Sequence, residues 1–293
     1  MGGSESSPPQ PRIDGMVPIN FGRQVEVHRL AVAGGETQIA RATGKRLGQA
    51  LLPRSRFAEA HAIATATLTL GPDAGAFYDR GWARRATGRP QPALDDYQQA
   101  LHLYQRAGDH GNEAATLNNI GNVHNGLGDR RQALDYYQQA LPILREVADR
   151  AGEAVTLNNI GLAYDGLGDR QQALDYYQQA LPITREVGDR ATEATTLNNI
   201  GSVYDGLGDR RQALDYLHRA LPISREVGDR AGEAVTWYNL AMIHRVDGNL
   251  VLAVAELERV VDLDRQVGHP DLADDTAMLK QVRHELAQTH IET

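Results

Sequence analysis

Pairs of adjacent asparagines recur at intervals of forty residues, and their side chains have the chemistry to bind a peptide backbone. Asn118, Asn158 and Asn198 are the first members of these pairs, each within the repeated word "LNNIG". A side-chain amide has two N–H donors and one oxygen acceptor, so it can pair with both polar groups of a peptide bond. Asparagine also weakens helices, because its side chain competes for backbone hydrogen bonds. Asparagines at regular positions in helices therefore need partners that offset this cost.

Two interpretations of the pairs are open. In the first, the amides form a row that hydrogen-bonds an extended peptide, and each bond contributes about 0.5–1.5 kcal/mol. In the second, one asparagine of each pair bonds across the hairpin interface to a backbone carbonyl and fixes the stacking. We assign ligand contact to the first asparagine of each pair. The second members are assigned a partly structural role: Asn119, Asn159 and Asn199.

Residues further along the same helical face differ between otherwise similar units. Their positions carry Asn122, Leu162, Ser202 and Met242, followed by Asn125, Asp165, Asp205 and Arg245. Variation on a constant scaffold is what graded specificity along a groove requires, although neutral change at exposed sites gives the same pattern. The predicted partner-binding set is Asn118, Asn122, Asn125, Asn158, Asp165, Asn198, Ser202, Asp205, Tyr238 and Arg245.

Residue patterns typical of catalysis are missing from the sequence. There is no cysteine, and the ten histidines show no close pairing typical of metal ligands. No G-x-x-x-x-G-K-[ST] phosphate loop and no serine-centred nucleophile elbow occur. The acid and base of "GDRAGE" fall at a helix start, where capping and exposed pairing explain them. We therefore predict no catalytic residue, no metal and no cofactor.

Composition and charge exclude further classes of partner. The formal net charge is -8, and acidic and basic residues are interspersed, which argues against a nucleic-acid partner. No apolar run has the length needed to cross a membrane. The amino-terminal residues, rich in Ser, Pro and Gly, lack the basic start and apolar segment of a secretory signal. We expect a disordered tail over residues 1–21 and a cytoplasmic protein.

The asparagines belong to a forty-residue repeat that predicts two helices per unit. In the first helix of one unit, Leu117, Ile120 and Leu127 fall on one apolar face, and Tyr137 and Leu144 do the same in the second. A helical hairpin of this kind cannot cover its own apolar face, so neighbouring units must stack.

The turn between the two helices has its own signature, "GLGD". Gly128 can adopt the left-handed conformation that ends a helix. Asp129 then offers an N-cap carboxylate with Gln132 three residues later, a pattern repeated at Asp169 and Asp209.

Proline falls deep inside each predicted second helix, at Pro142, Pro182 and Pro222. A proline there removes one backbone hydrogen bond and collides with the preceding turn. Because the apolar stripe continues beyond it, we favour a kinked helix. The alternative is a helix that stops near Leu141 and restarts.

Small residues at fixed positions, with Tyr137 followed by Ala140, resemble the tetratricopeptide repeat. The predicted structural positions of this resemblance are Gly121, Ala133, Gly161, Ala173, Gly201 and Ala213. The resemblance covers residues from about 41 to 270, and the longer units are similar to repeats of kinesin light chains, cell-polarity adaptors and bacterial signalling ATPases. It implies an all-α fold, a right-handed superhelical solenoid of helical hairpins whose first helices line a concave groove.

The predicted organisation places six repeats between two flanking helical segments. The expected limits are a tail at 1–21, a helical segment at 22–40, repeats at 41–74, 75–113, 114–153, 154–193, 194–233 and 234–269, and a capping helix at 270–290.

The resemblance implies a non-catalytic scaffold that binds a protein or peptide segment in the groove. The alternatives are a regulatory arm that switches a signalling effector on ligand binding and an architectural protein that self-associates. A carboxylate clamp is not implied, because only Lys45 matches it, whereas the next two units have Asp79 and Asn119.

Overall fold

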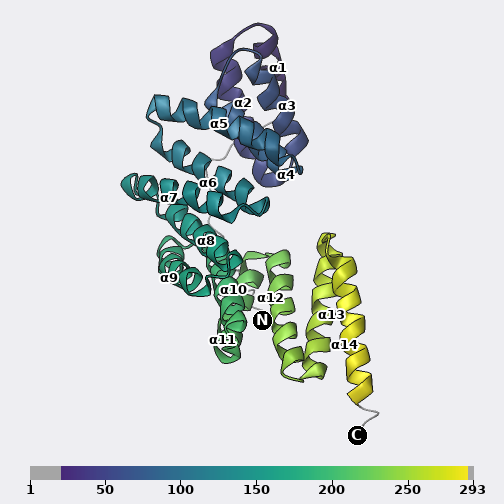
Figure 1. The fold of residues 1–293 in the computed structure, drawn as a ribbon. Helices are drawn as coiled ribbons and strands as arrows, with labels where there is room; N and C mark the ends of the chain where they lie inside the picture. Colours follow the sequence, from purple (N-terminus) through teal and green to yellow (C-terminus); the bar gives the residue numbers. More distant parts are fainter. Residues whose placement is uncertain (1–20, 290–293) are drawn as a thin grey trace, which may run out of the picture. The chain divides into compact units, whose positions relative to one another are not determined.

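The computed structural model describes residues 21–289, which contain fourteen α-helices, one 3-10 helix and no strand (Figure 1). These residues belong to two compact units, Met1–Leu103 and Tyr104–Thr293. The all-α fold is therefore confirmed. The predicted disordered tail lies outside the described residues apart from Phe21, which begins the first helix.

The first unit packs each helix on its neighbour in the chain. Its core consists of Leu47, Leu51, Leu52, Ala60, Ile63 and Ala83. Its elements are α1 (Phe21–Ala33), α2 (Thr37–Leu51), the 3-10 helix η1 (Leu52–Arg54), α3 (Phe57–Leu68), α4 (Ala74–Ala86) and most of α5 (Pro90–Ala107).

The second unit is a series of antiparallel helical hairpins followed by a final helix. Its helices are α6 (His110–Gly126), α7 (Arg130–Glu146), α8 (Arg150–Gly166), α9 (Arg170–Val187), α10 (Arg190–Gly206), α11 (Arg210–Val227), α12 (Arg230–Val246), α13 (Leu250–Val267) and α14 (Leu272–Thr289). The hairpins α6–α7, α8–α9, α10–α11 and α12–α13 pack internally, and α14 covers α13. None of the described helices combines the length and apolar character needed to span a membrane.

The hairpins α6–α7, α8–α9 and α10–α11 each close around a glycine on the first helix, whereas α12–α13 has Ala241 at this position. Gly121 and Gly161 face the rings of Tyr137 and Tyr177, which are fully buried on the second helices. An added Cβ would lie only 2.4 and 2.6 Å, respectively, from the nearest ring carbons. Gly201 has the same relation to Leu217. The glycines therefore permit the close approach of the two helices that the repeat requires.

The turns follow the predicted chemistry with one exception. Asp169 and Asp209 accept the backbone N–H groups of Gln172 and Gln212 at 3.2 and 3.1 Å, as N-caps do. Asp129 makes no such bond, so the prediction is wrong for this residue.

The second helices continue through their prolines. Pro142 lies inside α7, and Pro182 and Pro222 lie inside α9 and α11. The alternative of a helix that stops near Leu141 is therefore wrong.

Candidate functional site

The asparagine pairs form a ladder of side-chain hydrogen bonds between successive hairpins. Nδ2 of Asn159 donates to Oδ1 of Asn118 at 3.2 Å, and Nδ2 of Asn199 donates to Oδ1 of Asn158 at 3.3 Å. Nδ2 of Asn239 continues the series to Oδ1 of Asn198 at 3.1 Å. We call these three bonds the asparagine ladder.

Threonines on the same helices fix the orientation of the ladder. The hydroxyl of Thr156 donates to Oδ1 of Asn118 at 3.3 Å, and that of Thr196 donates to Oδ1 of Asn158 at 3.2 Å. Because the oxygens of Asn118 and Asn158 each face two donors of the next hairpin, the Nδ2 groups of these amides must point elsewhere.

The first asparagine of each pair keeps its N–H donors unused. Within residues 21–289, Nδ2 of Asn118, Asn158 and Asn198 donates to no protein atom. Asn158 is buried and the other two are half-buried. A row of amides with satisfied oxygens and available N–H groups can donate hydrogen bonds to carbonyl oxygens of a bound chain.

This arrangement combines the two interpretations drawn from the sequence. The pairs do bond across the interface between hairpins, but the acceptor is a side-chain amide and not the expected backbone carbonyl. The first asparagine is structural as well as available to a ligand. Its ligand contact stays a prediction.

The variable positions of the same face have different environments. Asn122 accepts the hydroxyl of Tyr137 at 2.8 Å, whereas Oδ1 of Asn125 is buried without a hydrogen-bond partner. Burial raises the pKa of Asp165, and two nearby arginines oppose that rise. Ser202 is exposed and Asp205 is half-buried.

Arg245 differs from the other variable positions because it contacts the final helix. Its Nε and Nη2 atoms donate to the two oxygens of Glu285 at 2.9 and 2.6 Å. This bidentate ion pair joins α12 to α14. The guanidinium of Arg245, which we predicted from the sequence to bind a partner, is therefore already paired with Glu285.

Pairs of stacked rings recur within successive hairpins, and their stacking was not predicted from the sequence. Tyr164 stacks on Tyr176 and Tyr204 on Tyr216, with ring centroids 5.5 Å apart in both pairs. His124 takes the place of the first tyrosine in the preceding hairpin. The forty-residue spacing of these rings was the signal that could have found them.

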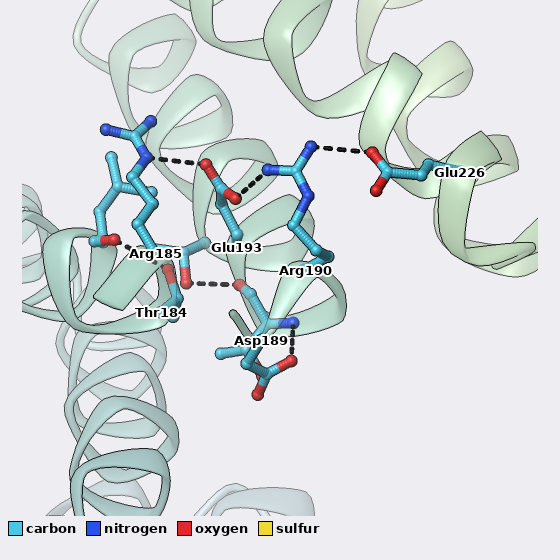
Figure 2. Close-up of polar contacts among 9 residues, drawn as sticks. Thr184, Arg185, Asp189, Arg190, Glu193 and Glu226 are labelled. Carbon is cyan, nitrogen blue, oxygen red and sulfur yellow. Dashed lines mark hydrogen bonds and ion pairs between the residues drawn. The ribbon is translucent and has the colours of Figure 1, made fainter. Parts of the chain in front are cut away.

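A buried glutamate in the first turn of α8, α10 and α12 bonds to an arginine of the preceding hairpin, as Figure 2 shows for Glu193. Oε1 of Glu193 accepts from Nε of Arg185 at 2.7 Å, and its other oxygen accepts from Arg190. Arg190 also donates to Glu226, on the second helix of the same hairpin, at 2.9 Å. Glu193 is only 3% exposed, and Glu233, the glutamate of "GDRAGE", is only 4% exposed, so the predicted exposed pairing in that motif is wrong for the carboxylate.

The same ion-pair chain occurs one hairpin earlier and, in shorter form, one hairpin later. Glu153 binds Arg145 and Arg150, and Glu233 binds Arg225 and Arg230. Burial raises the pKa of Glu153 and of Glu233, but the hydrogen bonds from their arginines outweigh it and leave both pKa values below the ordinary range.

Asp79, on α4, occupies the position where a carboxylate clamp would need its second basic residue. It lies against Gly48, and burial, with a smaller effect of the Asp73 carboxylate, raises the pKa of Asp79 to about 7. Across residues 21–289, no group of three or more histidine, aspartate or glutamate side chains is placed to hold a metal ion.

A sequence model of the tetratricopeptide repeat matches residues 74–146, 112–186 and 152–226, which together span more than half of the chain. The chain belongs to the tetratricopeptide repeat family. This confirms the resemblance inferred from the small residues and the helical period. A comparison with curated protein sequences gave no significant match.

Solved structures of tetratricopeptide proteins share the fold at low sequence identity. NprR in complex with its cognate peptide NprX is 17% identical, with a TM-score of 0.66 over 92% of this chain and 81% of that one. A putative kinesin light chain from Podosopora anserina, with nearly identical TPR-like repeats, is 14% identical, with a TM-score of 0.52 over 64% of this chain and 96% of that one. Aspartyl phosphate phosphatase F from Bacillus subtilis is 14% identical, with a TM-score of 0.60 over 87% of this chain and 74% of that one. At these identities the likeness shows the fold alone.

Proposed function

We propose that this tetratricopeptide repeat protein is a non-catalytic scaffold that binds an extended peptide segment of a partner along the asparagine ladder. The observation that carries the proposal is the set of unused N–H donors on Asn118, Asn158 and Asn198. Successive donors come from equivalent positions of successive hairpins, so they meet a bound chain at regular intervals.

The energetics favour a ligand with a repeating backbone. Each neutral hydrogen bond contributes only about 0.5–1.5 kcal/mol net, so a single amide would bind weakly. Three equivalent amides act together on an extended peptide, whose carbonyl groups also repeat. The variable residues of the same face, such as Ser202 and Asp205, are exposed or half-buried and supply side-chain selectivity.

The fold comparison supports a peptide as the ligand. NprR, which has the same fold, is described in complex with its cognate peptide. Aspartyl phosphate phosphatase F from Bacillus subtilis shares the fold. We propose no phosphatase activity for this chain, because its predicted site consists of amides, carboxylates, hydroxyls and one guanidinium, without a nucleophile–base pair.

The proposal is tested with peptides selected on the full chain from an unbiased displayed library. The binding of a selected peptide is then measured by calorimetry to the wild type and to the triple variant Asn118→Asp, Asn158→Asp and Asn198→Asp. Aspartate keeps the oxygen acceptors of the ladder but removes the N–H donors. We expect the dissociation constant to rise at least tenfold.

A matched control variant gains three negative charges at exposed positions of α5, α7 and α9. Gln99, Gln139 and Gln179 are exposed and recur at the same forty-residue spacing, so each is changed to glutamate. The control should bind the peptide like the wild type. Failure to select any peptide, or equal binding by the aspartate variant, would contradict the proposal.

A further inference from the structure

Helices α12, α13 and α14, with the turn before α14, line an open cavity of about 400 Å³ that is rich in carboxylates. Its polar lining includes Tyr238, Asp264, His269, Asp271, Asp274 and Asp275. No lysine or arginine is among the described residues that line it. The cavity is therefore an acidic site at the end of the hairpin series.

One carboxylate in this cavity is buried and has no basic partner. Asp264 is 1% exposed, and no N–H or hydroxyl group of the described residues donates to its Oδ2; a hydrogen bond joins its carboxyl group to that of Asp275 when Asp275 is protonated. Its Oδ1 lies 3.9 Å from Nδ1 of His269, but that nitrogen accepts the backbone N–H of Asp271 and cannot donate to Asp264. A buried carboxylate without a basic partner is costly to ionise, and a cationic ligand would supply both hydrogen-bond donors and positive charge.

The preceding hairpin interface shows that the scaffold does not need these acids. The residues forty positions earlier are all neutral. In the order Asp264, Asp271, Asp274 and Asp275, the equivalents are Ser224, Ala231, Ala234 and Val235. Two of these equivalents, Ser224 and Val235, line a smaller cavity of about 180 Å³ at the preceding interface, whose described lining has a single carboxylate, that of Asp229. The cluster of four carboxylates is thus specific to the last interface.

We propose that this cavity binds the cationic head group, guanidinium or ammonium, of an arginine or lysine side chain of the bound peptide. The inference rests on the proposed function and adds a basic residue to the peptide's recognition. Asp264 and Asp275 accept hydrogen bonds from the head group, and Tyr238 contributes an aromatic wall of the kind that attracts cations. A metal ion is a poorer fit, since the described residues include no group of three metal-ligating side chains.

The pKa of Asp275 reflects the acidic surroundings of the cavity. Burial, followed by the hydrogen bond to Asp264 and the negative charge of that carboxylate, raises the pKa of Asp275 to about 6. A bound cation favours the ionised carboxylate and would lower this pKa.

The test measures binding of three blocked tripeptides, Ala-Arg-Ala, Ala-Lys-Ala and Ala-Gln-Ala, to the full chain by amide NMR titration. We expect both basic peptides to shift resonances of α12, α13 and α14 and the glutamine peptide to shift none. Asp264→Ser and Asp275→Val install residues that the chain already uses at the preceding interface. Each should weaken binding of the basic peptides at least tenfold.

The control is Asp262→Asn, which removes one carboxylate from an exposed position of α13 outside the cavity. It should bind like the wild type. If Asp264→Ser does not fold, Asp275→Val decides the result. Equal binding of the arginine and glutamine peptides, unchanged binding by the folded cavity variants, or binding of Ca²⁺ without binding of a basic peptide would overturn the inference. The tripeptides do not depend on Asn118, Asn158 or Asn198, so this failure is distinguishable from failure of the proposed function.

Discussion

Replacing Gly161 by alanine should destabilise the second unit by about 1–2 kcal/mol. The new Cβ would lie 2.6 Å from Cε1 and 2.7 Å from Cδ1 of Tyr177. That ring is 1% exposed and belongs to a buried apolar cluster, which limits its movement. Over-packing of this kind costs about 1–3 kcal/mol, and the higher helix propensity of alanine returns about 0.5–1 kcal/mol. The net cost is the difference between these two effects.

The matched control is Gly126→Ala at the end of α6. Its added Cβ would meet no atom within 4 Å, so the change should be neutral or stabilising by up to about 1 kcal/mol. Urea unfolding followed by helical circular dichroism measures both variants, and hydrogen exchange should locate the loss of protection in α8 and α9. Equal unfolding midpoints for the two variants would refute the argument that the glycine permits close helix contact.

Three further predictions concern the turns, the ion pairs and the ladder. Ala148 has a φ of 56°, where the equivalent turns have glycine, so Ala148→Gly should raise the free energy of unfolding by about 1 kcal/mol in a urea titration. The folded-state pKa values of Glu153 and Glu233 lie below the ordinary value of 4.5, so these glutamates stabilise the fold fully above pH 4.5 and lose this effect as the pH falls through the folded values. The unfolding midpoint in urea should therefore decline on acidification, and it should decline less steeply in the variant Glu153→Gln. Asn159→Ala removes the donor to Asn118 and should cost about 0.5–1.5 kcal/mol in the same titration.

The repeat architecture was predictable because its determinants are local and periodic. Apolar residues at helical spacing define the two helices, and glycine followed by aspartate marks each turn. Asp169 and Asp209 cap their helices as expected, but Asp129, in nearly the same sequence, does not. A motif therefore predicts the position of a helix start better than it predicts an individual hydrogen bond.

The partners of the polar side chains were harder to predict because they lie in the next hairpin. The bond from Asn159 to Asn118 joins residues 41 positions apart, and its geometry depends on how the hairpins stack. Arg185 likewise donates to Glu193 of the next hairpin. Sequence spacing identified the residues, but only the stacked arrangement shows which atoms are used and which are left for a ligand.

The side-chain NH₂ resonances of Asn118, Asn158 and Asn198 offer the most direct test of the central claim. They are assigned by single aspartate substitutions and followed in a ¹⁵N NMR titration with a selected peptide. We predict that all three move with one common dissociation constant. The side-chain NH₂ resonance of Asn112, which donates to Asp109 at the start of α6, should stay unchanged. A peptide that binds while the three ladder resonances remain in place would contradict the account.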